Sequence, residues 1–89
     1  MTIGIVLHNN ERTLPNDLFV TVNDLNQGGG PAILVNQRIN VDQTFPLNVQ
    51  DDQNGNGNIT WTAAAVDGSK SLNATVSVTD GQTVEVTSW

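Results

Sequence analysis

The 89-residue chain contains no cysteine, which excludes a disulfide framework and a thiolate-bound zinc site. Positive charge is almost as scarce, because Arg12, Arg38 and Lys70 stand against nine acidic residues and the net charge is −6. Phosphate backbones and anionic membrane surfaces are bound by clustered lysine and arginine side chains. The sequence therefore predicts neither nucleic acid nor a membrane as a partner.

Side chains that perform catalysis are few. The chain has one histidine (His8), one lysine and no tyrosine, and no serine lies in a nucleophile-elbow motif. A serine–histidine–aspartate arrangement would have to combine His8 with one of four serines. Most of the seven aspartates lie in turn-like segments, where aspartate is common for conformational reasons. We therefore expect a protein that is not an enzyme.

Long apolar runs are also missing. The apolar run near the N-terminus covers residues 3–7, far fewer than the roughly 18 residues of a membrane-spanning helix. No basic segment precedes it, so no signal peptide is predicted. Localisation stays open: a cytoplasmic chain, a chain exported without a cleaved leader and one module of a longer protein all fit. The lack of cysteine is compatible with extracellular exposure.

Amide and hydroxyl side chains are abundant, with twelve asparagines, six glutamines and ten threonines. Threonine and valine favour strands, whereas asparagine and glycine favour turns. The helix formers glutamate, lysine and methionine contribute only two, one and one residues. A chain of this length suits one core. We predict a single all-β domain over residues 1–89, without a substantial helix.

Alternating apolar residues predict about seven short strands. These lie near residues 2–7, 18–23, 31–41, 45–49, 59–66, 72–79 and 83–87. Pro46 falls inside the fourth, which places that strand at a sheet edge or a bulge. Asp67-Gly68 and Asp80-Gly81 each predict an antiparallel hairpin. The expected fold is an antiparallel β-sandwich of the immunoglobulin-like or Greek-key type.

Two of the predicted strands contain apolar residues at successive positions, 32–35 and 63–66. Such runs are typical of strands that are covered on both faces. A central position between two layers would cover the second face, and so would self-association. Of these two, we expect a homo-oligomer.

The stretch DDQNGNGNITW, residues 51–61, is the most unusual in the chain. Oxygen-bearing side chains alternate from Asp52 and are followed by Gly57 and the apolar Ile59. This resembles the first eight positions of a calcium loop of the EF-hand kind, in which alternate oxygens turn toward a hard cation. The resemblance implies calcium as a cofactor and Gly57 at the sharp turn. The candidate metal ligands are Asp51, Asp52, Asn54, Asn56 and the carbonyl of Asn58.

The resemblance ends after eight positions. The twelfth position, a bidentate glutamate in the calcium loop, is Ala63 here, and no helix is predicted on either side. A carboxylate from Asp51, Asp42 or Glu85 would have to complete the shell, and the neutral amides predict weak binding. The alternative is a long polar turn, because the favoured turn dipeptide Asn-Gly occurs twice in this stretch.

Trp61 lies at the end of the same stretch, and Trp89 is the only other tryptophan. An indole beside amide-rich loops suits stacking on a sugar ring, and amides suit bonding to sugar hydroxyls. The candidate ligand-binding residues are Asn54, Asn56, Asn58 and Trp61. The competing interpretation is that Trp61 belongs to the core.

Two functions follow as hypotheses. The first is a non-enzymatic, lectin-like module that binds carbohydrate through its polar loops, with calcium assisting. The alternative is a structural, adhesion or decoration subunit that acts through protein–protein assembly. A small hydrolase is disfavoured by the shortage of catalytic side chains.

Overall fold

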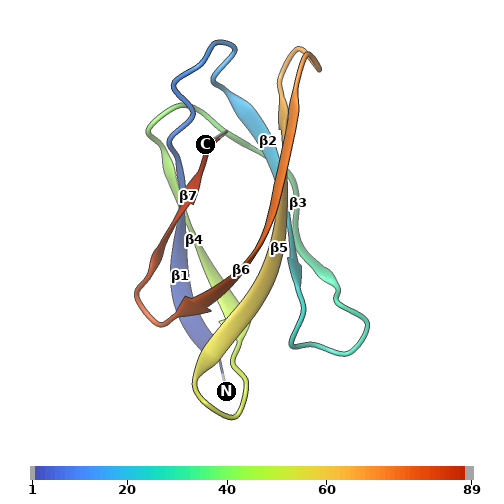
Figure 1. Cartoon of the computed structure of the whole chain (residues 1–89), viewed down its shortest axis with the longest axis vertical. Coiled ribbons are helices and arrows are strands. Elements are labelled where there is room, and N and C mark those ends of the chain that lie inside the picture. Colours follow the sequence, from blue (N-terminus) through green and yellow to red (C-terminus); the bar gives the residue numbers. More distant parts are fainter. Residues whose placement is uncertain (1, 88–89) are drawn as a thin grey trace.

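The computed structural model describes residues 2–87, which form seven strands and no helix (Figure 1). The strands, in chain order, are β1 (Thr2–Asn9), β2 (Leu18–Asp24), β3 (Ala32–Ile39), β4 (Thr44–Gln50), β5 (Asn56–Ala65), β6 (Ser71–Thr79) and β7 (Thr83–Val86). The prediction of an all-β fold with about seven short strands is confirmed.

The strands form two sheets that pack face to face as the two layers of a sandwich (Figure 1). The larger sheet has the order β3-β2-β5-β6, and all of its neighbours are antiparallel. The smaller sheet has the order β4-β1-β7, in which β1 is antiparallel to β4 but parallel to β7. The prediction of a wholly antiparallel sandwich is therefore wrong for this sheet. Successive strands alternate in direction, so the first and the seventh run the same way (Figure 1).

One of the two predicted hairpins is confirmed. Asp67-Gly68 joins β5 to β6, which pair antiparallel along their length. Asp80-Gly81 joins β6 to β7, which lie in different sheets, so the prediction of a hairpin there is wrong. Gly81 adopts a φ of 83°, and its N–H donates to the carbonyl of Gly4 at 2.7 Å. The turn is thus held against β1 and carries the chain across to the other layer.

The strand order differs from that of a constant-type immunoglobulin sandwich, where chain order gives sheets 1-2-5-4 and 3-6-7. Here β2 and β5 are again the central pair of one sheet, but β3 and β6 flank them. The Greek-key description of the connections stays a prediction.

The core fills the space between the two sheets. It is built from alternate residues, as the period-two patterns predict. The buried apolar residues are Ile3, Ile5, Leu7, Leu18, Val20, Val22, Ile39, Val49, Ile59, Trp61, Ala63, Ala65, Val78, Val84 and Val86. Pro46 lies in β4 at the edge of the smaller sheet, as predicted.

The two runs that are apolar at successive positions differ from the expectation. Residues 32–35 lie in β3, an edge strand, where Ala32 and Val35 are exposed, so this run is not covered on both faces. Residues 63–65 end β5, which lies between β2 and β6, and Val66 begins the turn that follows. There Ala63 and Ala65 are buried, while Ala64 and Val66 are half-buried. Only the second run occupies a central strand.

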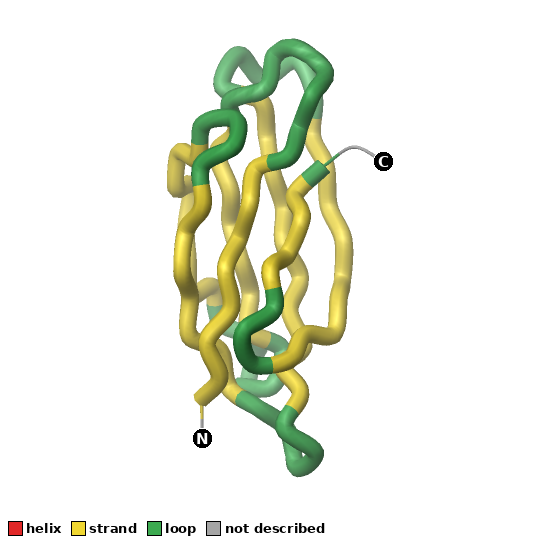
Figure 2. The backbone as a smooth tube through the Cα atoms, turned by 90° about the vertical axis from the view of Figure 1, so that its left-hand side faces the viewer, coloured by secondary structure: helices red, strands yellow, loops and turns green. Residues whose placement is uncertain are grey.

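The connections gather at the two ends of the sandwich (Figure 2). The end at the bottom of Figure 1 carries residues 25–31, 51–55 and 80–82, and the opposite end carries residues 10–17, 40–43 and 66–70. The predicted loop site therefore lies at the lower end, beside the glycine-rich loop between β2 and β3.

Candidate functional site

The loop at residues 51–55 is a tight turn organised by the carboxylate of Asp52. One oxygen of Asp52 accepts the backbone N–H groups of Asn54 at 2.7 Å and of Asn56 at 3.0 Å. The backbone N–H of Asp52 donates to the carbonyl of Asn56 at 2.7 Å, and Asp51 forms an isolated bridge with Gly57. Asp52 therefore acts as the acceptor that closes an Asx-type turn.

Gly57 does not occupy the sharp turn that the calcium-loop resemblance implies. The turn glycine is Gly55, with a φ of 81°, whereas Gly57 lies inside β5. A Cβ added at Gly57 would lie 2.8 Å from side-chain carbons of both Val49 and Val78. Glycine is needed there because the two sheets approach closely at that point.

Two of the remaining predicted ligands are strand residues. Asn56 and Asn58 belong to β5, and Asn54 is exposed in the loop before it. The backbone carbonyl of Asn58 accepts the N–H of Leu25 at 2.8 Å. The side-chain amide of Asn58 donates to the side-chain oxygen of Asn26 at 3.0 Å. Within residues 2–87, no three His, Asp or Glu side chains are placed to hold a metal ion. Calcium binding stays a prediction.

Asp24 joins this loop to the glycine-rich loop. Its carboxylate is fully buried at the end of β2 and accepts three N–H groups. These come from the backbone of Asn26 at 3.2 Å, the side chain of Gln27 at 2.9 Å and the backbone of Gln50 at 2.8 Å. The amide-rich lower end is thus largely occupied with holding its own loops together.

Trp61 is only 4% exposed and lies in the core of the larger sheet. Its partners across the sheet are Val22 in β2 and Ala74 in β6. The structure supports the competing interpretation of this residue, because a buried indole presents no face for a sugar to stack on. Trp89 lies outside the described residues.

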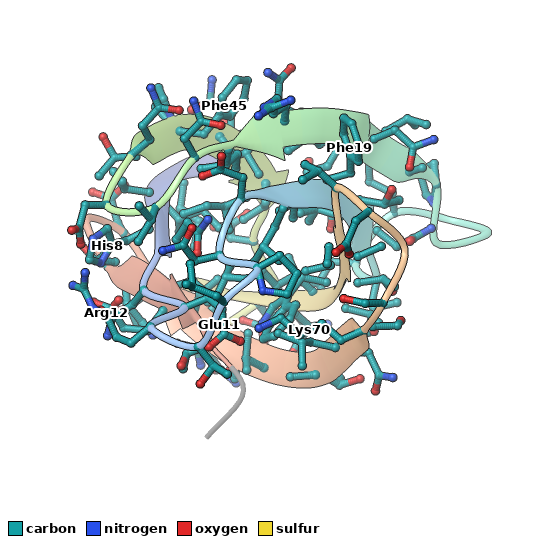
Figure 3. The ribbon with its side chains drawn as sticks, turned by 90° about the horizontal axis from the view of Figure 1, so that it is seen from above. His8, Glu11, Arg12, Phe19, Phe45 and Lys70 are labelled. Carbon is teal, nitrogen blue, oxygen red and sulfur yellow. The ribbon has the colours of Figure 1, made fainter. Side chains whose placement is uncertain are left out.

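Charged side chains gather at the upper end, where Figure 3 shows His8 beside Arg12. The ring of His8 contacts Glu85 at 2.6 Å through Nδ1 and Asp42 at 3.4 Å through Nε2. Arg12 contacts Asp42 at 2.6 Å, and its hydrogen bond is the main reason that the pKa of Asp42 lies below the usual value. The two nitrogens of His8 point at different carboxylates. The cluster therefore forms a surface network of polar contacts that contains the Arg12–Asp42 ion pair.

Glu11 and Lys70 form a second contact at the same end (Figure 3). Glu11 is fully buried, and the Nζ of Lys70 lies 3.4 Å from its carboxylate. Lys70 also donates to the carbonyl of Thr13 at 2.6 Å. This contact ties the start of β6 to the loop between β1 and β2, which is a structural role.

A sandwich has four edge strands, and three of them here are unsuited to pairing with another strand. β3 is bulged at two places, and each bulge adds one residue to β3 relative to β2. The first lies opposite the step from Val20 to Val22, and the second lies opposite the step from Val22 to Asn23. β7 has only four residues. β4 carries Pro46, which lies opposite Val6. Bulges, short length and proline are the usual means of protecting a sheet edge.

Pro46 costs the smaller sheet no hydrogen bond. The N–H of Asn9 donates to Gln43 at 3.1 Å, so the odd-numbered residues of β1 bond toward β4 in an alternating ladder. Val6 bonds toward the other neighbour, since its N–H donates to Gln82 at 3.0 Å. Position 46 therefore faces outward, where a missing N–H matters only to an incoming strand.

β6 is the exception among the four edges. It has nine residues, pairs with β5 in an unbroken register, and contains no charged residue, proline or glycine. Its outer-face residues are exposed, whereas Leu72, Ala74 and Val76 are half-buried against the core. It is a long, regular and uncharged edge.

The ladder shows which backbone groups of β6 face the open side. The N–H of Ala65 donates to Lys70 at 3.0 Å, so the bonded pairs with β5 involve the even-numbered residues of β6. The odd-numbered residues point their N–H and C=O groups outward. The N–H of Thr79 donates to the side-chain oxygen of Gln82, and the carbonyl of Thr79 accepts the backbone N–H of Gln82, both at 3.0 Å. The outward groups that remain belong to Ser71, Asn73, Thr75 and Ser77.

Sequence reasoning missed this edge, although its signal was present. The alternation predicts β6 itself, but Asp80-Gly81 predicts a hairpin with the seventh strand, which would cover the edge. A nine-residue segment of high strand propensity without a charge is itself the signal of an unprotected edge.

The described residues enclose no pocket, and they contain no helix long and apolar enough to cross a membrane. Comparisons with family models, with curated proteins and with solved structures find no match to this chain. Function must therefore be argued from the surface of the sandwich itself.

Proposed function

We propose that this protein is a non-enzymatic structural module that assembles with a protein partner by adding a strand to its larger sheet at β6. The observation that carries the proposal is the outward row of backbone groups on Ser71, Asn73, Thr75 and Ser77. An exposed sheet edge binds an extended segment through main-chain hydrogen bonds, and alternate side chains then supply the specificity.

Two further properties support this function. The half-buried side chains of Leu72, Ala74 and Val76 line the inner side of β6, and an added strand would complete their burial. The edge also bears no charge in a chain whose net charge is −6, so a strand can approach it without desolvating an ion.

A generic strand peptide tests the proposal. The probe alternates threonine and valine over nine residues and carries two lysines at each end for solubility. Titration into isotope-labelled protein should shift the amide resonances of Asn73, Thr75 and Ser77, and should slow their hydrogen exchange, more than those of β3. Thr75→Pro should weaken the binding at least tenfold, because it removes an outward N–H and leaves the bonds to β5 in place.

The matched control is Asn48→Pro. Asn48 lies in β4, opposite Gly4 of β1. Its N–H therefore also faces outward, on the edge that already carries Pro46. This variant should bind the peptide like the natural chain. Circular dichroism and thermal unfolding check that both variants fold. If the peptide leaves the β6 amides unchanged at millimolar concentration, strand addition is wrong.

Carbohydrate binding is a second candidate function, favoured by one observation. The lower end concentrates side-chain amides, among which Asn54 is exposed at the tip of its loop. A glycan array tests this candidate, with calcium included in one arm. Asn54→Ala should reduce a glycan signal, and Asn48→Ala is the control, since Asn48 is an exposed asparagine on β4. A folded sample without any signal would count against this candidate.

A further inference from the structure

We infer that the strand added to β6 is β6 of a second copy, paired antiparallel about a twofold axis at Ala74. The inference rests on the proposed function and names its partner. Two four-stranded sheets would join into one continuous sheet through a self-complementary contact.

The outward backbone groups select this register. With the axis at Ala74, Ser71 pairs with the partner's Ser77, and Asn73 pairs with the partner's Thr75. Every pair then joins residues whose N–H and C=O groups face outward, and each pair exchanges two hydrogen bonds. An axis at Thr75 would instead require Thr79, whose N–H and C=O groups already bond to Gln82.

The side chains match in the same register. Leu72 faces the partner's Val76, Ala74 faces the partner's Ala74, and these are the apolar residues of β6 that remain half-buried in one protomer. On the outer face, hydroxyl and amide side chains lie opposite one another, with Asn73 beside the partner's Thr75. The strand is thus complementary to itself on both faces.

The charge distribution allows two copies to meet at this edge. Each copy carries a net charge of −6, but none of it lies in β6. Two protomers therefore repel at long range and have no charge to desolvate at the contact. Salt screens the repulsion and leaves backbone hydrogen bonds and apolar contacts in place, so dimerisation should strengthen as ionic strength rises.

Cysteine crosslinking tests both the partner and the register, because the natural chain has no cysteine. In this register Ala74 and the partner's Ala74 form a non-hydrogen-bonded pair with a Cα separation of about 4.5 Å, within the range of a disulfide. Ala74→Cys should therefore form a covalent dimer under mild oxidation. Thr75 and the partner's Thr75 lie diagonally, about 7–8 Å apart, so Thr75→Cys should crosslink at least tenfold more slowly.

Thr62→Cys is the matched control for random collision. Thr62 is exposed on the same outer face of the larger sheet as Thr75, but it lies on the interior strand β5. It should crosslink no faster than Thr75→Cys. If Thr75→Cys crosslinks faster than Ala74→Cys, the register is wrong; if Thr62→Cys is as fast as Ala74→Cys, the contact at β6 is wrong.

Light scattering over micromolar to millimolar concentrations gives an independent measurement without a cysteine. The natural chain should show a dimer that increases with salt, Thr75→Pro should lower the dimer fraction at least tenfold, and Asn48→Pro should not. A chain that stays monomeric, with no Ala74→Cys dimer, overturns self-pairing. If the strand peptide still shifts the β6 amides in that case, strand addition survives with another partner; if it does not, both proposals fall.

Discussion

The two edges of the larger sheet, β3 and β6, differ in almost every property that governs strand pairing. β3 is interrupted by two register shifts, and Asn36 within it adopts a φ of 48°. It also carries the charge of Arg38. β6 is longer, regular and uncharged. β3 pairs with β2 and β6 pairs with β5, and these two central strands pair with each other in an unbroken register. The register shifts therefore arise from the sequence of β3 itself.

This comparison shows that exposed hydrophobicity and capacity for pairing are separate properties. β3 exposes the more conspicuous apolar side chain, since Val35 is 64% exposed. Its backbone groups nevertheless follow no regular ladder, because each bulge shifts the direction in which they point. β6 shows less apolar surface and a complete row of aligned donors and acceptors. Backbone regularity therefore identifies the binding edge better than apolar exposure does.

The largest expected effect comes from removing the residue that supports both halves of the sheet. Trp61 lies between Val22 and Ala74, so Trp61→Ala should open a cavity beneath β2 and β6 together. We expect a loss of about 3–5 kcal/mol in the free energy of unfolding, measured by urea denaturation. Phe19→Ala is the control, since Phe19 is 36% exposed and should cost much less.

Equal losses for the two variants would mean that the indole contributes no more than a surface ring. The prediction also affects experiments on carbohydrate binding. A glycan signal lost in Trp61→Ala would follow from unfolding alone, so Asn54→Ala is the informative variant.

A smaller loss of stability should distinguish a substitution on the β6 side of the sheet from one in the loop beside β3. Gly57→Ala places a methyl group 2.8 Å from side-chain carbons of Val49 and Val78, which belong to opposite sheets. Overpacking of this kind costs about 1–3 kcal/mol. Gly28→Ala adds a methyl group with no neighbour within 4 Å and should be nearly neutral. Urea denaturation compares them, and similar values would show that the sheets separate freely at Gly57.

The bulged edge can be tested by comparable substitutions on both edges. Asn36→Val places a β-branched residue at a φ of 48° and should cost about 1–2 kcal/mol. Ser77→Val, at an exposed position of the regular edge, should stay within about 0.5 kcal/mol. If Asn36→Val is neutral in thermal unfolding, the bulge is not held by the left-handed residue.

The sequence predicted the strands well and their partners less well, for a physical reason. Alternation at Ile3, Ile5 and Leu7 reports burial directly, because side chains alternate across a strand. Asp-Gly reports a tight turn, but not whether the strands on either side pair. At Asp80-Gly81 the turn is present and its hydrogen bond goes to Gly4, a residue distant in sequence. Local chemistry carries no information about such a partner.

The loop site illustrates the same limit. The spacing of Asp52, Asn54 and Asn56 is compatible with a cation loop and with an Asx-type turn, and the two differ in where the backbone N–H groups point. In the structure, those of Asn54 and Asn56 point at Asp52. The role of Gly57 was also hidden, because the close approach of Val49 and Val78 depends on how the two sheets pack. Local hydrogen bonds therefore set the conformation of the turn, whereas tertiary packing sets the role of Gly57.

Calcium gives the smallest expected effect, and it should act on one edge only. Asn56 lies opposite Thr79, so an ion held by Asp52, Asn54 and Asn56 would steady the end of β6 and leave β3 unaffected. For a dissociation constant of about 10⁻³ M, 10 mM calcium adds at most about 1.4 kcal/mol, or several degrees in melting temperature. Magnesium should do less, because it demands stricter octahedral geometry.

Asp52→Asn keeps an acceptor for the turn but removes the charge, and should abolish the response to calcium. Hydrogen exchange should slow at Ser77 and Thr79 but not at Leu34. A melting temperature that calcium leaves unchanged would make Asp52 the acceptor of a polar turn and nothing more.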